Sequence, residues 1–409
     1  MKLLNFGSCN IDYVYMLDHI VNVGETESTH NLSTFCGGKG LNQSIACARA
    51  GAKVYHAGCI GEDGQILSQL LEQNGVDTRY IKRTEGKNGH AIIQVTPSGE
   101  NSIFIFAGSN AKITREDVDS TLFNFEKGDF ILLQNEISNL AYIVKTAKQK
   151  GLDIILNPSP INEKIAELDL NDISILILNE IEAKMLSGAN DANGALEYFK
   201  KNYPLLKVVL TLGSYGSFYQ FGGEKIYQNT YKVDVVDSTA AGDTFTGYLV
   251  AEIIKGTKIK DALQIASCAA AISVTRHGAA PSIPTYNEVK KAIKVLEPKQ
   301  QNIVLKMLKE KIEEYVDANL STVCLQDVAD FLGYSSVYTS NLIKKLTNMS
   351  YVEFLLERRL VKAEELIKNT DISIGEIFFR VGYQNENYFR KKFAKRYGKN
   401  PLEYRKGRE

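Results

Sequence analysis

The stretch DSTAAGDTFTG, residues 237–247, crowds small residues and two acids in front of a run whose apolar residues recur at helical spacing. A helix is therefore expected to begin next to Asp243. The first amides of a helix lack partners within it, and the helix dipole is positive at that end, so the amides of residues 240–243 can converge on a phosphate. Asp243 has two interpretations: it caps the helix, or it accepts a proton from a hydroxyl that attacks the phosphate.

The residues before this stretch alternate short apolar runs with amphipathic runs. The strand-like runs are KLLNFGSC, KVYHAGCIG, DFILLQNE, DIILNPSP, ISILILNE and LKVVLTLG. Helical periodicity between them is typical of a parallel sheet covered by helices on both faces, an α/β fold. Residues 89–110 break the rhythm with two alternating strands around the turn PSGEN. We expect this hairpin to form a small β flap.

The pattern changes after residue 297. A polar stretch with Pro298 follows, and we expect a linker at residues 298–302. From residue 303 to residue 409 only helical periodicity occurs, in about seven short helices. The sequence therefore predicts an α/β domain at 1–297 and an all-α domain at 303–409.

The composition is that of an ordinary globular protein: 409 residues, 44% apolar, 23% charged, with a formal net charge of zero. From Lys299 onward there are 20 Lys and Arg against 15 Asp and Glu, so only the tail is expected to meet a polyanion. The six cysteines form no CxxC pair, and no apolar run approaches the ~20 residues of a membrane span. We expect a cytoplasmic protein with no membrane partner.

Two common phosphate-binding motifs are missing from the first domain: GGKG lacks the spacing and the Ser/Thr of a P-loop, and no GxGxxG follows a strand. DSTAAGDTFTG instead closely resembles the C-terminal signature of the ribokinase-like (PfkB) carbohydrate kinases. GSCNIDYVYML and FCGGKGLNQSIACARAGA resemble their N-terminal signature. LLQNE, LNPSP, LILNEIEAKML, VVLTLGSYGSF and AAAISVTRHGAAPSIP follow in the family's order. The resemblance covers about residues 1–296 and implies a ribokinase-like three-layer α/β/α fold.

The resemblance also implies ATP-dependent phosphate transfer to a sugar hydroxyl. Asp243 would be the general base, beside an anion hole formed by Ala240, Ala241 and Gly242. The sugar would be held by Asn10, Asp12, Gly38, Lys39, Asn42 and Glu136. Converging polar groups discriminate steeply, because a wrong sugar leaves buried groups unpaired. This complete set favours ribose or a related pentose, and a deoxypentose or a nucleoside stays open. The main departure from the family is Ser238, where a second Thr is usual.

Nucleotide and cation sites follow from the same resemblance. ATP would contact Asn179, Thr211, Gly213, Ser214 and Gly216. Glu182 would act on Mg²⁺ through water, although an exposed i,i+3 pair with Asn179 at a helix start is the simpler interpretation. A potassium site would use Asp237, Thr239 and the Ser282 hydroxyl, with carbonyls around Ser273, Arg276 and Gly278. None of the five histidines has ligand spacing, so ordinary surface or core roles are expected.

The second domain contains the same arrangement twice. LQDVADFLGYSSVYTSNLIKKLTN reads as helix, turn, helix, and SIGEIFFRVGYQNENYFRKKFAKRYGKNPLEYRKGR repeats it. A single unit is also compatible with the corner of a helical bundle. Two units joined by a helical segment suit adjacent turns of a DNA major groove. The block 303–405 closely resembles the DNA-binding domain of the AraC/XylS family of transcription regulators.

That resemblance places recognition helices at about residues 336–346 and 386–396. Base readers would be Ser340, Asn341, Asn387 and Lys391, since Asn pairs with adenine and Lys with guanine. Phosphate contacts, or solvated positions, would be Lys344, Lys345, Arg390, Lys392 and Lys395. The first helix has few long polar side chains, so its contribution to specificity stays open. Phe389, Phe393 and Tyr397 recur at helical spacing and are expected in the core.

The leading hypothesis is a bifunctional protein: a sugar kinase, with ATP, Mg²⁺ and K⁺, joined to a domain that binds double-stranded DNA, acting as a homodimer. The alternative is a catalytically weak kinase-fold sensor that regulates transcription when sugar or nucleotide binds. Asp243 favours the enzyme, because a sensor needs no base. A third, weaker hypothesis makes the basic domain an interaction module.

Overall fold

The computed structural model describes residues 1–409 apart from 99, 190, 300–302, 333 and 407–409. The chain divides into two compact units, residues 1–300 and residues 301–409.

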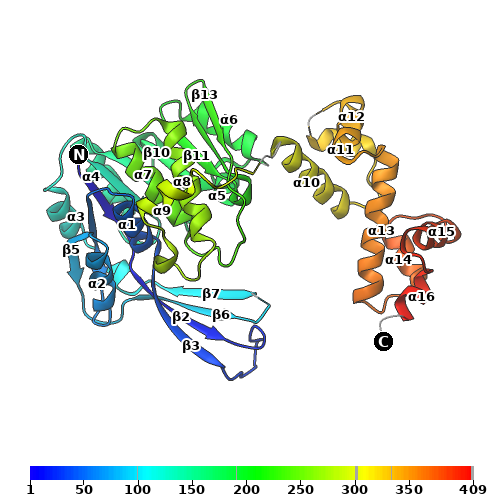
Figure 1. The fold of residues 1–409 in the computed structure, drawn as a ribbon, viewed down its shortest axis with the longest axis horizontal. Helices are drawn as coiled ribbons and strands as arrows, with labels where there is room; N and C mark the ends of the chain where they lie inside the picture. Colours follow the sequence, from blue (N-terminus) through cyan, green and yellow to red (C-terminus); the bar gives the residue numbers. More distant parts are fainter. Residues whose placement is uncertain (99, 190, 300–302, 333, 407–409) are drawn as a thin grey trace. The chain divides into compact units, whose positions relative to one another are not determined.

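The first unit is built on a nine-stranded sheet with the order β13-β12-β11-β10-β9-β8-β1-β4-β5 (Figure 1). Its strands are β1 (Leu3–Phe6), β4 (Val54–Ile60), β5 (Asp77–Arg83), β8 (Phe130–Gln134), β9 (Asp153–Asn157), β10 (Ile175–Asn179), β11 (Lys207–Thr211), β12 (Ser217–Phe221) and β13 (Glu224–Gln228). All neighbours from β11 to β5 are parallel. The edge strands β12 and β13 are antiparallel, so the prediction of a parallel sheet is wrong at this edge. Gly222 and Gly223 form the two-residue turn between them, as a tight hairpin requires.

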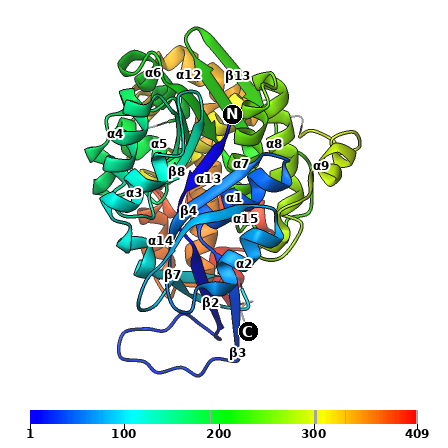
Figure 2. The ribbon, with the colours of Figure 1, turned by 90° about the vertical axis from the view of Figure 1, so that its left-hand side faces the viewer.

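Helices cover both faces of this sheet, which confirms the three-layer prediction. Figure 2 shows α3–α6 on one side and α1, α2 and α7–α9 on the other. Their bounds are α1 (Lys39–Arg49), α2 (Gln65–Gln73), α3 (Arg115–Leu122), α4 (Leu140–Lys150), α5 (Glu180–Ser187), α6 (Ala192–Asn202), α7 (Ala241–Ile254), α8 (Ile259–Ser273) and α9 (Tyr286–Ala292). Short 3₁₀ helices are η1 (Gly108–Lys112), η2 (Glu163–Glu167), η3 (Leu170–Asp172), η4 (Gly213–Tyr215) and η5 (Ala280–Ser282). Strand β4 is buried at every position, as cover on two sides demands.

A separate four-stranded sheet forms the flap (Figure 1). Its strands are β2 (Asn10–Met16), β3 (Asn31–Gly37), β6 (Gly89–Val95) and β7 (Asn101–Phe106), in the order β3-β2-β6-β7. The predicted flap at residues 89–110 contains β6 and β7 only, so the prediction is too small by the strands β2 and β3. Strand β2 pairs in parallel with β6 along its whole length. The strand that carries Asn10 and Asp12 therefore belongs to the flap.

Seven helices make up the described part of the second unit: α10 (Ile303–Ala318), α11 (Leu325–Leu332), α12 (Ser336–Thr347), α13 (Tyr351–Asn369), α14 (Ile374–Arg380), α15 (Glu386–Tyr397) and α16 (Pro401–Lys406). One core gathers side chains of α10–α12 with the first half of α13, and a second core gathers the other half of α13 with α14–α16. Phe389 and Phe393 are fully buried and Tyr397 packs against them, as predicted. Helix α13 thus joins two small helix-turn-helix bodies.

The described residues at the junction between the units, 297–299, make backbone contacts with the first unit. The Lys299 amide donates to Thr230 O (2.8 Å), and the Lys232 amide donates to Glu297 O (3.0 Å). Pro298 forms a bridge with Tyr231. Residues 300–302 of the predicted linker lie outside the described residues.

Candidate functional site

A cavity of about 270 Å³ lies at the carboxyl ends of three parallel strands. Asn157, Asn179 and Thr211 are the last residues of β9, β10 and β11, and the start of α7 faces them. Ligands of open α/β sheets bind at this edge. The lining residues are Lys39, Asn157, Ser159, Ile177, Leu178, Asn179, Glu182, Thr211, Ser238, Ala240, Ala241, Gly242, Asp243 and Thr246.

Helix α7 begins at Ala241, after Ala240 in a left-handed conformation with φ 57°. A non-glycine residue there costs of order 1–3 kcal/mol, and such strain concentrates at functional sites. Ala240 has no side chain able to cap the helix, and Asp243 is the third helical residue. The interpretation of Asp243 as the helix cap is therefore wrong.

The Asp243 carboxylate is buried, with 8% exposure, and is held by two side-chain amides of α1. Asn42 Nδ2 donates to Oδ2 (3.0 Å), and Gln43 Nε2 donates to Oδ1 (2.9 Å). Both oxygens therefore have a fixed neutral donor, and the carboxylate borders the cavity.

The backbone at the α7 N-terminus is open for an anion. The Ala241 amide donates to Ser238 O (3.2 Å), so it is engaged. Within the described part of the chain, the amides of Gly242 and Asp243 donate to no other group. A Cβ added at Gly242 would meet nothing within 4 Å, so neither packing nor backbone conformation requires glycine there. This narrows the predicted anion hole of residues 240–243 to the amides of Gly242 and Asp243.

The predicted sugar residues form a second group beside Asp243. Glu136 accepts hydrogen bonds from the Lys39 amide (3.0 Å) and the Ser8 hydroxyl. Asn10 Oδ1 accepts from Asn110 Nδ2 (2.7 Å). Gly38 precedes α1 with φ 92°, and a Cβ there would lie 2.9 Å from the Asn10 amide. Lys39, Gly38, Asn10 and Glu136 are thereby tied into one polar wall.

Burial and the neighbouring charged side chains shift the pKa values of Asp12, Lys39 and Glu136. Burial and the nearby Glu136 raise the pKa of Asp12 to about 6. Burial also raises the pKa of Glu136, against the opposing effect of Lys39. Burial alone would lower the pKa of Lys39, but Asp243, Glu136 and Glu182 together raise it above its ordinary value. The ammonium is thus held charged by the carboxylates around it.

The predicted nucleotide residues are only partly gathered at the cavity. Asn179 and Glu182 form a capping box at the start of α5: Asn179 Oδ1 accepts from the Glu182 amide (2.9 Å), and Glu182 Oε2 accepts from the Asn179 amide (3.0 Å). The pair does open a helix, but Glu182 is buried, so the simpler interpretation is wrong in expecting an exposed pair. Asn179, Glu182 and Thr211 all line the cavity. Gly213, Ser214 and Gly216 form the loop after β11 and do not line it.

The predicted potassium residues come from two loops that lie together. The amides of Val236 and Asp237 donate to Val274 O (2.8 and 3.1 Å). Asp237 accepts from the Thr239 amide (2.8 Å) and the Gly278 amide (2.9 Å). Burial acts to raise the pKa of Asp237, but the hydrogen bonds from the Thr239 hydroxyl and from these two amides together hold it below its usual range.

The potassium-site residues predicted in the second loop, residues 273–282, are held by hydrogen bonds to nearby backbone carbonyls. The Arg276 amide donates to Ser273 O (3.1 Å), and the Ser282 hydroxyl donates to Ala279 O (2.7 Å). The atoms that these two loops offer as metal ligands are all oxygens, which hard cations such as K⁺ prefer.

Sequence reasoning missed the buried amides behind the site. Gln43 and Gln134 are 1% and 0% exposed, and Asn5 is fully buried. For Asn5 and Gln134 the signal was a polar residue in an otherwise apolar strand, whereas Gln43 stands between the polar residues Asn42 and Ser44 and had no such signal. Such groups are rare in cores unless they are hydrogen-bonded.

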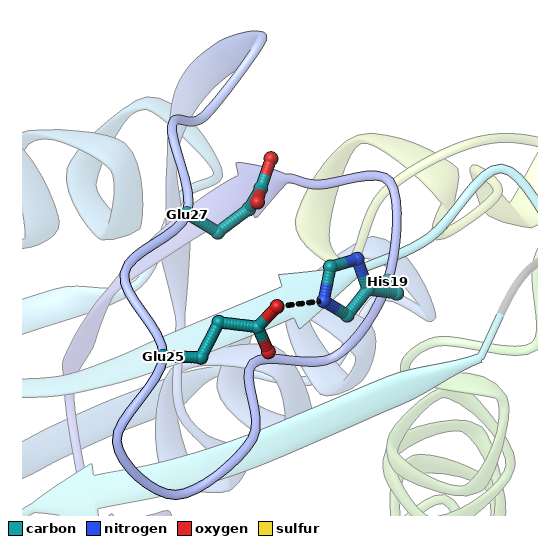
Figure 3. A group of neighbouring side chains, drawn as sticks. All are labelled: His19, Glu25 and Glu27. Atoms are coloured by element: carbon teal, nitrogen blue, oxygen red, sulfur yellow. Dashed lines mark hydrogen bonds and ion pairs between the residues drawn. The ribbon is translucent and has the colours of Figure 1, made fainter.

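One group of possible metal ligands lies elsewhere, in the loop between β2 and β3 (Figure 3). His19 Nε2 lies 2.8 Å from Glu25 Oε1, with Glu27 close by, and the hydrogen bond to Glu25 raises the pKa of His19. The other Glu25 oxygen accepts from Asn22. The solvent-accessible His19–Glu25 pair and the Asn22 hydrogen bonds lie outside the cavity and account for the arrangement without an ion.

The two predicted recognition helices of the second unit, α12 and α15, both carry exposed polar residues at predicted DNA-binding positions. Asn341, Lys344 and Lys345 on α12 are exposed, as are Asn387 and Lys391 on α15, while Ser340 and Lys392 are half-buried. Arg390 is paired with Glu386 on the same helix.

A side chain that sequence reasoning missed stands on α12. Val337 is 74% exposed at the second helical position, where α15 carries Asn387. Val337 and Asn387 each lie two positions after a helix cap, Ser335 and Asn385. Aligning the two units on these caps would have shown that Val337 occupies the position of a predicted base reader.

No helix in the described ranges combines the length and the apolar character needed to cross a membrane.

Comparisons with known proteins match both units. A family model described as pfkB family carbohydrate kinase matches residues 1–286, and a helix-turn-helix domain model matches residues 328–407. The ribokinase of Haemophilus influenzae is 36% identical over 293 residues, which cover 69% of this chain and 95% of that protein.

Two solved structures are similar to the first unit. The ribokinase of Cryptococcus neoformans, in complex with ADP, has a TM-score of 0.64 and 35% identity, covering 71% of this chain and 99% of its own. The ribokinase of Arabidopsis thaliana, complexed with ribose and ATP, has a TM-score of 0.64 and 31% identity, covering 72% and 98%.

Proposed function

Because this chain belongs to the pfkB family of carbohydrate kinases, and carries an AraC/XylS-type helix-turn-helix domain after its kinase domain, we propose that it is bifunctional. It is an ATP-dependent carbohydrate kinase, and both resemblances predicted from the sequence are confirmed. In our proposal the acceptor is ribose or a related pentose. The second domain binds specific DNA sequences and regulates transcription.

The observation that carries the catalytic proposal is the Asp243 carboxylate, fixed beside the two open amides of α7. Asp243 takes the proton of the sugar hydroxyl as its oxygen attacks the γ-phosphorus of ATP. The bond between that phosphorus and the β–γ bridging oxygen breaks, and ADP leaves with the electron pair. The amides of Gly242 and Asp243 donate to the oxygens on which negative charge builds up.

The sugar is held, in this proposal, by the polar wall of Asn10, Gly38, Lys39 and Glu136 together with Asp12 and Asn42. Two observations support it. Asn42 Oδ1 is buried and has no hydrogen-bond partner among the described residues, so it can accept from a sugar hydroxyl. Asp12 and Asn10 stand on the flap sheet, so a movement of the flap would bring them to the sugar and exclude water.

Two cations fit the chemistry of the residues present. Glu182, buried and at the cavity, would hold Mg²⁺ through water, and Mg²⁺ neutralises phosphate charge when bound. Asp237, the Ser282 hydroxyl and the carbonyls near Ser273 and Gly278 would hold K⁺. These loops adjoin Ser238 and Ala240, so a cation there supports the strained backbone that begins α7.

For the second domain we propose that α12 and α15 enter successive turns of the major groove. Asn341, Asn387 and Lys391 are exposed and able to reach base edges. The exposed Val337 offers apolar contact to a thymine methyl group instead of a hydrogen bond. Dimerisation stays a prediction.

The kinase proposal is tested by measuring phosphate transfer from ATP to a panel of pentoses, deoxypentoses, hexoses and nucleosides. The full chain should phosphorylate ribose or a close relative, and Asp243→Asn should lower kcat by a factor of about 10² or more. Sugar binding without transfer to any acceptor would leave the sensor alternative in place.

The regulator proposal is tested by recovering duplexes from a random-sequence DNA library with the full chain. A defined motif with two half-sites is expected, and its affinity should fall steeply with salt. Recovery of unrelated sequences would remove the proposal of sequence-specific regulation.

A further inference from the structure

We propose that Gln43 is a positioning residue for phosphate transfer: its side-chain amide sets the orientation of the Asp243 carboxylate. The inference rests on the proposed role of Asp243 as the base. Gln43 itself does not line the cavity, so it acts through Asp243.

The contacts of Gln43 leave its side chain one arrangement. It is 1% exposed on α1, and its Nε2 donates to Asp243 Oδ1 (2.9 Å) and to Asn157 Oδ1 (3.1 Å). Its Oε1 accepts from Gln134 Nε2 (2.7 Å). All three polar contacts are therefore satisfied at once, which is what a buried amide requires.

The next residues of this chain of amides fix which end of Gln43 faces Asp243. Gln134 Nε2 also donates to Asn5 Oδ1 (3.1 Å), and Asn5 Nδ2 donates to Gly40 O (2.7 Å) and Ser44 Oγ (2.8 Å). A flipped Gln43 amide would place Oε1 against the Asp243 carboxylate and an N–H against the Gln134 amide. Both contacts would be repulsive, so the network holds the donor toward the base.

Close packing of α1 against α7 brings the amide within reach. A Cβ at Gly247 on α7 would lie 2.4 Å from the Ala46 Cβ and 2.9 Å from Gln43 O. The two helices therefore approach backbone to backbone one turn beyond Asp243. At this distance the short side chains of Asn42 and Gln43 span the gap and hold one oxygen each.

Holding both oxygens prevents the carboxylate from rotating out of line with the acceptor hydroxyl. A misplacement of about 1 Å at a reacting group costs as much as 10²-fold in rate. Loss of the Gln43 donor should therefore lower kcat by about 10- to 100-fold. It should change KM for sugar and ATP by less than about 3-fold, because Gln43 contacts neither.

The test compares Gln43→Met with Gln220→Met in the full chain. Gln220 is a matched control: it is 4% exposed, its Nε2 donates to Leu196 O (2.7 Å), and it lies on β12, away from Asp243. Both variants lose a buried amide of the same size, so both should lower the midpoint of thermal unfolding. Only Gln43→Met should lower kcat. Equal kcat in the two variants, at matched fractions folded, would overturn the inference.

A pH profile separates positioning from packing. In Gln43→Glu the new carboxyl donates to Asp243 when protonated and repels it when ionised. The activity of Gln43→Glu relative to the parent should thus fall as pH rises. The other charges facing this point, Lys39, Glu136 and Glu182, are the same in both proteins. A constant ratio across pH would contradict the inference.

Asp243→Asn distinguishes failure of this inference from failure of the proposed function. In the Asp243→Asn background, Gln43→Met should have no further effect on kcat, because the group it positions is gone. If Asp243→Asn retains the parent kcat, the base assignment itself fails. If Asp243→Asn loses activity and Gln43→Met does not, only the positioning role fails.

Discussion

Gly242→Ala should stabilise the kinase domain and inactivate it. Gly242 is the second residue of α7, its φ lies outside the left-handed region, and an added Cβ meets nothing within 4 Å. Alanine is favoured over glycine in a helix by up to about 1 kcal/mol, so the unfolding midpoint should rise by about 1–3 °C. The Cβ would, however, stand at the open amides where the transferred phosphate is proposed to bind, and kcat should fall by a factor of about 10² or more.

The assay follows ADP release at saturating sugar and ATP, alongside thermal unfolding of the same preparation. Gly375→Ala is the matched control, because Gly375 is also the second residue of its helix, α14, and a Cβ there also meets nothing within 4 Å. Its kinase activity should equal that of the parent. A Gly242→Ala protein with parental kcat would show that the phosphate does not approach the α7 N-terminus, and the catalytic proposal would fall with it.

Three further outcomes are expected. Burial raises the pKa of Asp12 to about 6, and sugar hydroxyls donate best to its ionised form. The kcat/KM for sugar should therefore fall as pH drops through about 6. Asp12→Asn should weaken sugar binding and remove this fall in kcat/KM at low pH. Asp237→Asn should abolish activation by KCl over NaCl in the ADP-release assay while leaving the fold intact by circular dichroism. Lys391→Ala should relax base preference at one operator position by about 1–3 kcal/mol in competition binding, whereas Lys395→Ala should weaken all duplexes alike and reduce the salt slope by about one.

Local patterns predicted the elements whose residues are close in sequence. The start of α7 beside Asp243 and the two helix-turn-helix units follow from helical periodicity. The antiparallel edge also had a local signal, the Gly222-Gly223 turn between two strand-like runs, which sequence reasoning did not use.

Long-range pairing had no such signal. Whether β2 joins the main sheet or the flap depends on its pairing with β6, which lies about eighty residues later along the chain. The contact between Gln43 and Asp243 joins residues 200 positions apart and depends on the helix approach at Gly247. The sequence shows the two polar residues, and only the packing shows that they meet.

The choice of neutral amides beside Asp243 suits a base better than a cation would. A lysine or arginine in place of Gln43 would orient the carboxylate equally well. Opposite charge, however, favours the ionised form of a carboxylate and so weakens it as a proton acceptor. Lys39 is the one ammonium among the described residues that line the cavity, and its charge is shared among Asp243, Glu136 and Glu182. Orientation by Asn42 and Gln43, with the positive charge shared, keeps Asp243 both fixed in direction and able to take the sugar's proton as the phosphoryl group moves.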